Sequence, residues 1–273
     1  MSVIDSPQNQ YVKRLRSLAT GKGRARHREF LVEGVRALEE ALAGGAELKL
    51  VASCPELLTS ERAQAVVEQL QACGAEFLEM TERAFRALSQ VEAPEGVAAA
   101  AAIPDIGLAD LPAQAALVVA AVEVRQPGNL GALLRTADAA GADAFIAVGS
   151  SVDLYEPKVV RATAGSIFHL PVAQDVAPDE MLSWARAEGM ATVAACLEDA
   201  RPYAEVAYPP RTLVMVGNEA HGLNAEVASQ ADLKVFIPMP GRAESLNVAV
   251  AAGILTYEIL RQREHDKDCE GEK

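Results

Sequence analysis

Residues 117–141 read LVVAAVEVRQPGNLGALLRTADAAG, and this stretch decides the fold of the second half of the chain. Leu117–Val122 is a continuous apolar run, which predicts a fully buried strand. The Pro-Gly pair at 127–128 predicts a turn, after which Asn129 is a candidate cap for a helix that begins near Gly131. Open α/β folds bind ligands at polar loops that follow the carboxyl ends of parallel strands. The stretch therefore predicts an α/β domain with a ligand site at this loop.

Further apolar runs follow the same pattern along the second half. They alternate with helix-length segments, and buried runs separated by helices indicate a parallel sheet covered on both faces. We expect the strands of this sheet at Ala116–Val122, Ala144–Val148, Thr192–Cys196, Leu213–Val216 and Lys234–Ile237.

The first third of the chain reads as a smaller alternation of helices and strands, from Asn9–Leu18 to Gly96–Ile103. Turn residues at 104–107 and 111–112, with no strong periodicity, indicate a domain boundary. We expect a small N-terminal α/β domain at 1–105, a linker at 106–112, a larger domain at 113–266 and an acidic tail at 267–273.

Two further loops follow predicted strands and carry similar residues. The first reads Gly217-Asn-Glu-Ala-His-Gly222-Leu, and its glycines let the backbone approach a ligand closely. The second reads Pro238-Met-Pro-Gly-Arg-Ala-Glu-Ser-Leu-Asn-Val248 and leads into the helix Val248–Leu260. The apolar positions of this helix are not confined to one stripe. We therefore expect it to be buried on several sides, within the domain or against a second subunit.

The composition excludes several classes of protein. Half of the 273 residues are apolar, so a sizeable core can form. The longest apolar run, Ala115–Val122, is far shorter than the roughly 20 residues of a membrane span, and the N-terminus lacks a signal-peptide core. The four cysteines and the four histidines are scattered, which argues against a disulfide framework and a metal site. We expect a cytoplasmic protein without a metal.

The charge is distributed unevenly along the chain. The formal net charge of −13 argues against general binding to nucleic acid, yet seven basic residues and no acid lie between Lys13 and Arg28. This stretch is either a directed RNA-binding patch or a solvated helix face that keeps the N-terminus soluble. Composition alone leaves both readings open.

The familiar site patterns do not fit. The sequence contains no GxGxxG loop after a strand, no Walker phosphate loop, no GxSxG elbow and no HExxH pair. A dehydrogenase is therefore a poor interpretation. A lone Arg135 would ordinarily pair with a surface carboxylate.

Taken together, the three loops resemble the signature motifs of the SpoU (TrmH-type) RNA ribose 2′-O-methyltransferases, within the SPOUT superfamily. The resemblance covers Asn129–Arg135, Gly217–Gly222 and Ile237–Asn247, in order and at similar separations. The segment from Pro157 to Pro171 is similar to the stretch between the first two motifs, and the N-terminal third to a substrate-binding domain of many members. The resemblance spans nearly the whole chain.

The resemblance implies a deep trefoil knot in the C-terminal sheet, S-adenosylmethionine as cofactor, and a homodimer formed through the last helix. It implies a catalytic set of Arg135, Asn129, Glu219, Ser245 and Asn247, with Arg135 central as a fixed positive charge. Asn129 and Ser245 would orient Arg135 and the RNA, Asn247 would shape the site, and Glu219 would hold the loops or position the ribose. The cofactor would be bound by Gly217, Gly222, Ile237, Met239, Gly241, Leu246 and Cys196.

The RNA is expected to bind the basic N-terminal residues Lys13, Arg14, Lys22, Arg24, Arg26 and Arg28. Ribosomal RNA is the favoured substrate, with transfer RNA, an inactive RNA-binding relative and a base-modifying relative as alternatives. Many members carry an acidic residue where this chain has Gln126, which affects the fine geometry of the loop.

Overall fold

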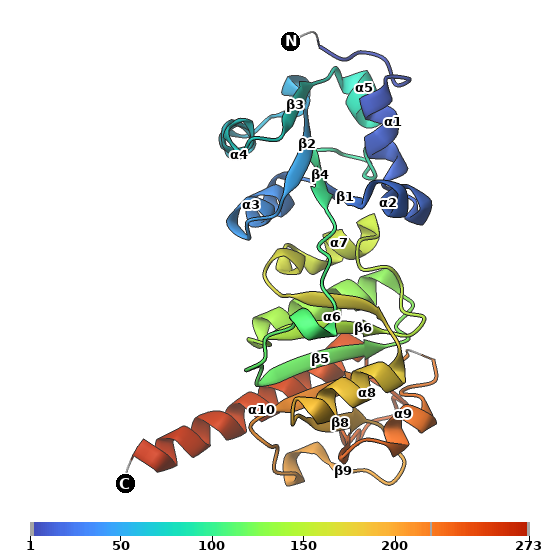
Figure 1. The fold of residues 1–273 in the computed structure, drawn as a ribbon, viewed down its shortest axis with the longest axis vertical. Coiled ribbons are helices and arrows are strands. Elements are labelled where there is room, and N and C mark those ends of the chain that lie inside the picture. Colours follow the sequence, from blue (N-terminus) through green and yellow to red (C-terminus); the bar gives the residue numbers. More distant parts are fainter. Residues whose placement is uncertain (1–2, 219, 272–273) are drawn as a thin grey trace. The chain divides into compact units, whose positions relative to one another are not determined.

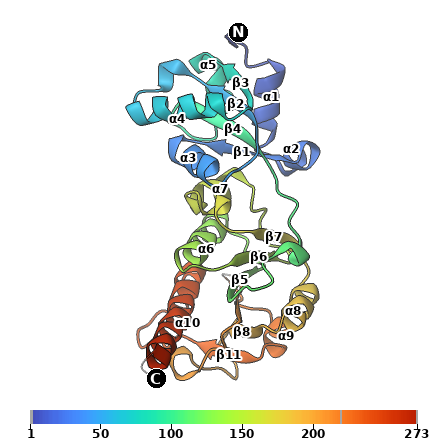
Figure 2. The ribbon, with the colours of Figure 1, turned by 60° about the vertical axis from the view of Figure 1, so that its left-hand side comes forward.

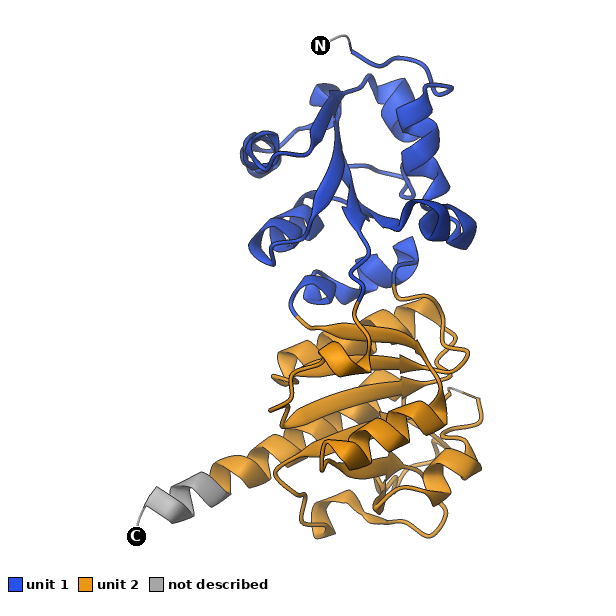
Figure 3. Ribbon diagram, viewed as in Figure 1, with its two compact units in different colours: residues 1–105, 155–169 blue, residues 106–154, 170–273 orange. Residues whose placement is uncertain are grey.

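The computed structural model describes residues 3–218 and 220–271, and the side chains of residues 3–218 and 220–265. The chain divides into two compact units, which Figure 3 shows in different colours. The first comprises Met1–Asp105 and Tyr155–His169, and the second comprises Ile106–Leu154 and Leu170–Lys273. The break after Asp105 falls where the sequence predicts the end of the N-terminal domain. No helix of the described residues is long and apolar enough to cross a membrane.

The first unit is built on a four-stranded sheet of order β1-β4-β2-β3 (Figure 1). β4 lies antiparallel to β1 and β2, and β3 lies parallel to β2. Val12, Leu15 and Phe85 are fully buried against one face of this sheet. The strands are β1 (Glu29–Glu33), β2 (Leu48–Ser53), β3 (Glu76–Glu79) and β4 (Val97–Ala102); the helices are α1 (Gln10–Ser17), α2 (Gly21–His27), α3 (Val35–Ala43), α4 (Glu61–Ala72) and α5 (Glu82–Arg86).

A segment from the middle of the chain completes the first unit. It contains α7 (Pro157–Thr163) and a 3-10 helix, Ser166–Phe168. The ring of Phe30 in β1 lies 4.8 Å from that of Tyr155 and 6.0 Å from that of Phe168, measured between centroids. The sequence places this segment in the larger domain, at 113–266, because no local pattern reveals that its aromatic residues pack on Phe30.

The second unit confirms the predicted α/β fold with a parallel sheet. Its seven strands are all parallel, in the order β7-β6-β5-β10-β8-β11-β9. Helices α6 and α10 lie on one face and α8 and α9 on the other (Figure 2). The strands are β5 (Leu117–Val122), β6 (Ala144–Val148), β7 (Val172–Val176), β8 (Ala191–Ala195), β9 (Arg201–Pro202), β10 (Thr212–Val216) and β11 (Leu233–Phe236); the helices are α6 (Pro127–Ala139), α8 (Pro178–Ala187), α9 (Ala225–Ser229) and α10 (Val248–Gly271).

The strand order determines where the loops meet. β5, β10, β8 and β11 are consecutive neighbours in the sheet. Because all four run parallel, their carboxyl ends lie at one edge, and the loops that follow them are neighbours too. The loops quoted from the sequence follow β5, β10 and β11. The expected trefoil knot is not tested by the strand order and stays a prediction.

The last helix, α10, is buried on one side only within the chain. Leu255 and Ile259 are fully buried, whereas Val250 is 51% and Tyr257 is 52% exposed. α10 packs closely on α6, since a Cβ added at Gly253 would lie 3.2 Å from the Cγ2 of Thr136. The backbone of the predicted acidic tail continues α10 as far as Gly271; its side chains, and residues 272–273, lie outside the described residues.

Candidate active site

The first motif forms the start of α6, and this differs from the sequence prediction. α6 begins at Pro127, with Gln126 as the N-cap residue, so the predicted turn at 127–128 is the first turn of the helix. Proline is favoured at the first helical position because its missing N–H has no partner there in any case. Asn129 therefore lies inside the helix and does not cap it. Its side chain instead makes a hydrogen bond to the third motif.

Asn129 contacts the third motif directly. The Nδ2 of Asn247 donates a hydrogen bond to the Oδ1 of Asn129 over 2.8 Å, although the two residues are 118 positions apart. The Oδ1 of Asn247 accepts from the backbone N–H groups of Ala249 and Val250, at 2.9 and 3.4 Å, and so caps α10. One asparagine thus caps the last helix and joins the first and third motifs.

The second motif folds back on itself at Gly217. A Cβ at Gly217 would lie 2.2 Å from the backbone nitrogen of Leu223 and 2.3 Å from the carbonyl carbon of Gly222, so only glycine fits. Gly222 has a φ of +70° and donates its N–H to the carbonyl of Asn218 over 2.8 Å. Positive φ values favour glycine, because it has no Cβ to clash.

Asn218 joins the second motif to the first. Its Nδ2 donates to the carbonyl oxygen of Glu123 over 2.9 Å, and its Oδ1 accepts from the N–H groups of Ala220 and His221 at 2.8 and 3.3 Å. Neither Asn218 nor Glu123 is among the site residues predicted from the sequence. The sequence did contain a signal for both residues, because each is polar and lies within two positions of the end of a buried strand. Glu219 lies outside the described residues, so its expected catalytic role stays a prediction.

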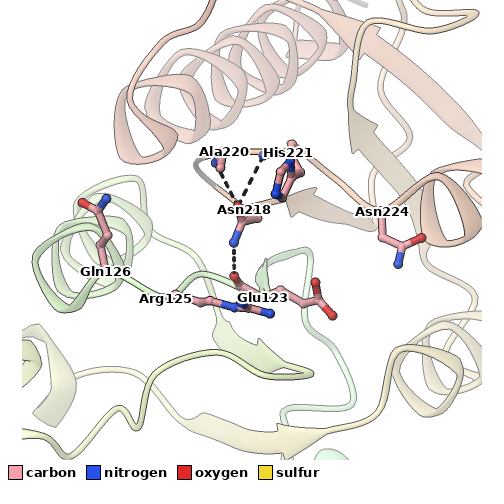
Figure 4. Close-up of a pocket in the computed structure, with 8 residues that line it drawn as sticks. Glu123, Arg125, Gln126, Asn218, Ala220, His221 and Asn224 are labelled. Atoms are coloured by element: carbon pink, nitrogen blue, oxygen red, sulfur yellow. Dashed lines mark hydrogen bonds between the residues drawn. The ribbon is translucent and has the colours of Figure 1, made fainter.

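A cavity of about 470 Å³ lies between these two loops (Figure 4). This volume falls within the roughly 300–1,000 Å³ typical of ligand sites. The described residues that line it come from the second motif, from the segment that precedes the first motif, and from the position just after the second: Glu123, Arg125, Gln126, Asn218, Ala220, His221, Gly222 and Asn224.

Arg135 is exposed, two turns along α6 from Asn129. Within the described part of the chain its side chain makes no hydrogen bond or ion pair. A lone arginine would ordinarily form an ion pair with a surface carboxylate. Among the described residues, Arg135 forms no such ion pair. The guanidinium is therefore a positive charge that is available to a phosphate or to a neighbouring subunit.

The loop after β11 carries most of the remaining predicted residues. Ile237 and Met239 are partly buried, Gly241 and Ser245 are exposed, and Leu246 is 37% exposed. Among the described residues, positions 237–246 take part in no hydrogen bond. Their backbone groups are therefore free to bind a ligand.

Cys196 follows β8, the neighbour of β11. Its backbone N–H donates to the carbonyl of Val235 over 3.0 Å, and burial raises the pKa of its thiol. The next residue, Leu197, is 70% exposed. The ends of β8, β10 and β11 thus bring together unpaired backbone groups and an apolar surface. This combination fits an adenosine-bearing cofactor, whose base offers an apolar face and a hydrogen-bonding edge.

Most of the basic N-terminal patch lies on α1 and α2, and the residues are not equivalent. Lys13, Lys22, Arg26 and Arg28 are exposed. Arg14 is paired with the buried Glu29, and Arg28 reaches Asp105 at 3.0 Å. Arg24 requires a correction, because it is 5% exposed and donates to the carbonyl oxygen of Leu18 over 3.0 Å. It helps to hold the fold of this unit and does not belong to the surface patch.

A metal site is not supported by the described residues, which contain no cluster of three or more His, Cys, Asp or Glu side chains able to hold an ion.

Comparison with known proteins gives matches over both units. The SpoU rRNA Methylase family model matches residues 116–257, and the MRM3-like substrate binding domain model matches residues 9–99. A relative from Bacillus subtilis, named 23S rRNA (guanosine(2553)-2′-O)-methyltransferase RlmP, is 36% identical over 95% of this chain and 99% of its own length. The 23S rRNA (uridine(2479)-2′-O)-methyltransferase of Streptomyces viridochromogenes is 33% identical over 88% of this chain and 85% of its own.

Solved structures give the same picture. The AdoMet-bound rRNA methyltransferase from Sinorhizobium meliloti has a TM-score of 0.86 at 33% identity, covering 95% of this chain and 97% of that one.

Proposed function

Because this chain belongs to the SpoU rRNA methylase family, we propose that it transfers a methyl group from S-adenosylmethionine to a ribose 2′-hydroxyl of ribosomal RNA. The observation that carries the proposal is the hydrogen bond between Asn129 and Asn247, which joins the first and third motifs at the edge where the second motif also lies. The fold, both family matches and the full-length relatives support it.

The residues at the ends of β8, β10 and β11 would hold the cofactor. In this proposal, backbone groups of Gly217, Gly222 and the loop 237–241 would bind its polar atoms, and Cys196 and Leu246 would flank them. The sulfonium centre of S-adenosylmethionine supplies a methyl group that is already activated for displacement. The chain must therefore mainly orient the two reactants and make the ribose hydroxyl more nucleophilic.

Arg135 is the residue to which we assign charge stabilisation. Its guanidinium holds a phosphate of the RNA and stabilises the alkoxide that develops on the ribose oxygen, while the hydroxyl proton passes to that phosphate. Arg135 does not act as an ordinary base, because a guanidinium offers hydrogen-bond donors and no acceptor. Asn129 and Ser245 orient Arg135 and the RNA, and Asn247 fixes Asn129 and the start of α10.

A homodimer formed through α10 is part of the proposal. Val250 and Tyr257 are seven residues apart, hence on one face of the helix, and about half of each side chain is exposed. Leu246, just before the helix, is also exposed. An apolar face of this kind is best explained by a second copy that covers it.

Ribosomal RNA is favoured over transfer RNA by the named activities of the full-length relatives and by the match of the N-terminal unit to a substrate-binding domain. The exposed residues Lys13, Lys22 and Arg26 are the proposed contacts to RNA phosphates. A cytoplasmic location is part of the proposal, and a substrate of this kind supports it. An inactive RNA-binding relative is disfavoured by the presence of the whole motif set.

The test of the proposed chemistry is Arg135→Ala. Removal of a preorganised donor costs about 3–4 kcal/mol, so methyl transfer to unmodified 23S rRNA should fall by a hundredfold or more. Binding of S-adenosylmethionine and the melting temperature should stay as in the wild type, because Arg135 is exposed and makes no hydrogen bond with the described residues. Near-normal turnover in the variant would contradict the role given to Arg135.

A further inference from the structure

Most side chains that line the cavity between the first two loops have no part in the proposed methyl transfer. The cavity lies between the loop after β5 and the loop after β10 (Figure 4). Among the described residues that line it are one carboxylate, one guanidinium, one imidazole and three side-chain amides. Such a lining suits a planar ligand with many hydrogen-bonding groups better than an apolar one.

All three lining amides make hydrogen bonds within the chain, and the Oε1 of Gln126 accepts from the Nδ2 of Asn129 over 3.3 Å. Asn218 uses its Nδ2 on the carbonyl of Glu123 and its Oδ1 on the N–H groups of Ala220 and His221. Asn218 therefore holds the shape of the cavity, and its amide is not available to bind a ligand there. Asn224 uses only its Oδ1, which accepts from the N–H of Glu226 over 2.8 Å and caps α9. The Nδ2 of Asn224 has no acceptor among the described residues and remains a donor.

Glu123 is the side chain that stands out. Its φ of +55° is uncommon for a residue other than glycine, and such backbone strain gathers at functional sites. Within the described part of the chain its carboxylate makes no hydrogen bond or ion pair. Figure 4 shows the Glu123 carboxylate and the Asn224 amide extending from opposite loops toward the same side of the cavity.

We propose that this cavity receives the base of the target nucleotide and that Glu123 and Asn224 select guanine. The inference rests on the proposed function and adds the identity of the nucleotide. A carboxylate only accepts hydrogen bonds. Guanine presents two adjacent donors, N1–H and the N2 amino group, which match the two oxygens of Glu123. The neighbouring O6 of guanine accepts from the Nδ2 of Asn224.

The same groups disfavour uracil. Uracil has a single donor, N3–H, between two carbonyl oxygens, so a carboxylate placed against it meets at least one oxygen. To enter the cavity the base must leave the RNA stack, and enzymes that extrude a base commonly read its Watson–Crick edge in this way. One of the two relatives is named for a guanosine and the other for a uridine, so the methylated base varies among similar chains.

The experiment uses the full chain, labelled S-adenosylmethionine and an unmodified 23S rRNA transcript. The labelled nucleotide is mapped, and three further transcripts are made that differ only at that position. We expect a guanosine, with kcat/KM about 10- to 100-fold higher than for the uridine transcript, the range of one bidentate contact to a base.

Three variants accompany the wild type. Glu123→Gln replaces an acceptor oxygen by a donor and should remove most of the preference for guanosine. Asn224→Asp keeps the helix cap, because aspartate caps as well as asparagine, but loses the donor to O6 and should slow transfer to guanosine. Glu180→Gln, an exposed position on α8, is the matched control and should behave as the wild type.

The outcomes separate the two proposals. A labelled uridine, or an unchanged guanosine preference in both Glu123→Gln and Asn224→Asp, overturns the selection of guanine while the proposed methyl transfer stands. An absence of transfer by the wild type to any RNA contradicts the proposed function and overturns this inference with it. Equal binding of S-adenosylmethionine by all variants shows that a lost preference does not come from a damaged cofactor site.

Discussion

Replacement of Asn247 by alanine tests whether one side chain joins two motifs and caps a helix. The change removes the hydrogen bond to the Oδ1 of Asn129 and the acceptor for the N–H groups of Ala249 and Val250. Loss of an N-cap typically costs about 1 kcal/mol. Loss of a neutral hydrogen bond adds about 0.5–1.5 kcal/mol. We therefore expect Asn247→Ala to lower the free energy of unfolding by about 1.5–2.5 kcal/mol.

Two further variants divide this loss. Asn247→Ser keeps a capping hydroxyl but is too short to reach Asn129, so it should lose only the pair energy, about 0.5–1.5 kcal/mol. Asn129→Ala should lose a similar amount, and the double variant should be less destabilised than the sum of the single variants. Urea unfolding followed by circular dichroism gives each value. Strict additivity of Asn129→Ala and Asn247→Ala would show that the two side chains do not interact and would refute the reasoning.

The remaining predictions concern other parts of the chain. Gly217→Ala should lower the melting temperature and weaken S-adenosylmethionine binding, because its Cβ would lie 2.2 Å from the backbone nitrogen of Leu223; differential scanning fluorimetry with and without cofactor measures both effects. Arg24→Ala should destabilise the chain, because Arg24 is buried, whereas Arg26→Ala should leave stability unchanged and reduce the salt dependence of RNA binding by about one unit of slope. If Arg24→Ala instead left stability unchanged and reduced the salt dependence of RNA binding, Arg24 would belong to the RNA-binding surface. Val250→Glu places a charge on the exposed apolar face of α10 and should convert the proposed dimer into a monomer, as measured by sedimentation velocity. A variant that forms a dimer of unchanged stability would show that this face is not the interface.

Much of the larger unit was predictable from sequence because its strands are buried on both faces. Ala144–Val148 matches β6 residue for residue, and the predicted runs at β5, β8, β10 and β11 are displaced by at most one residue at either end. β7 was missed, because Gln174 and Asp175 interrupt its apolar run and Asp175 takes a positive φ.

The site was predictable only in part, because a sequence pattern does not show which distant residues contact each other. The motif pattern identified Asn129 and Asn247, but their contact joins positions 118 residues apart and depends on the strand order. Asn129 was taken for a helix cap because asparagine after Pro-Gly fits a turn equally well, whereas the helix begins at Pro127. The burial of Arg24 could not be predicted, because every second residue from Lys22 to Arg28 is basic and the pattern does not distinguish Arg24 from its neighbours.

In the proposed function, three distant loops form one site that methylates a ribose oxygen of ribosomal RNA. The most direct measurement is mass-spectrometric mapping of the product formed from purified protein, isotope-labelled S-adenosylmethionine and unmodified 23S rRNA. We expect one labelled nucleotide, with the methyl group on the ribose 2′-oxygen. A methyl group on a base, or the absence of any labelled nucleotide under conditions where the cofactor binds, would contradict it.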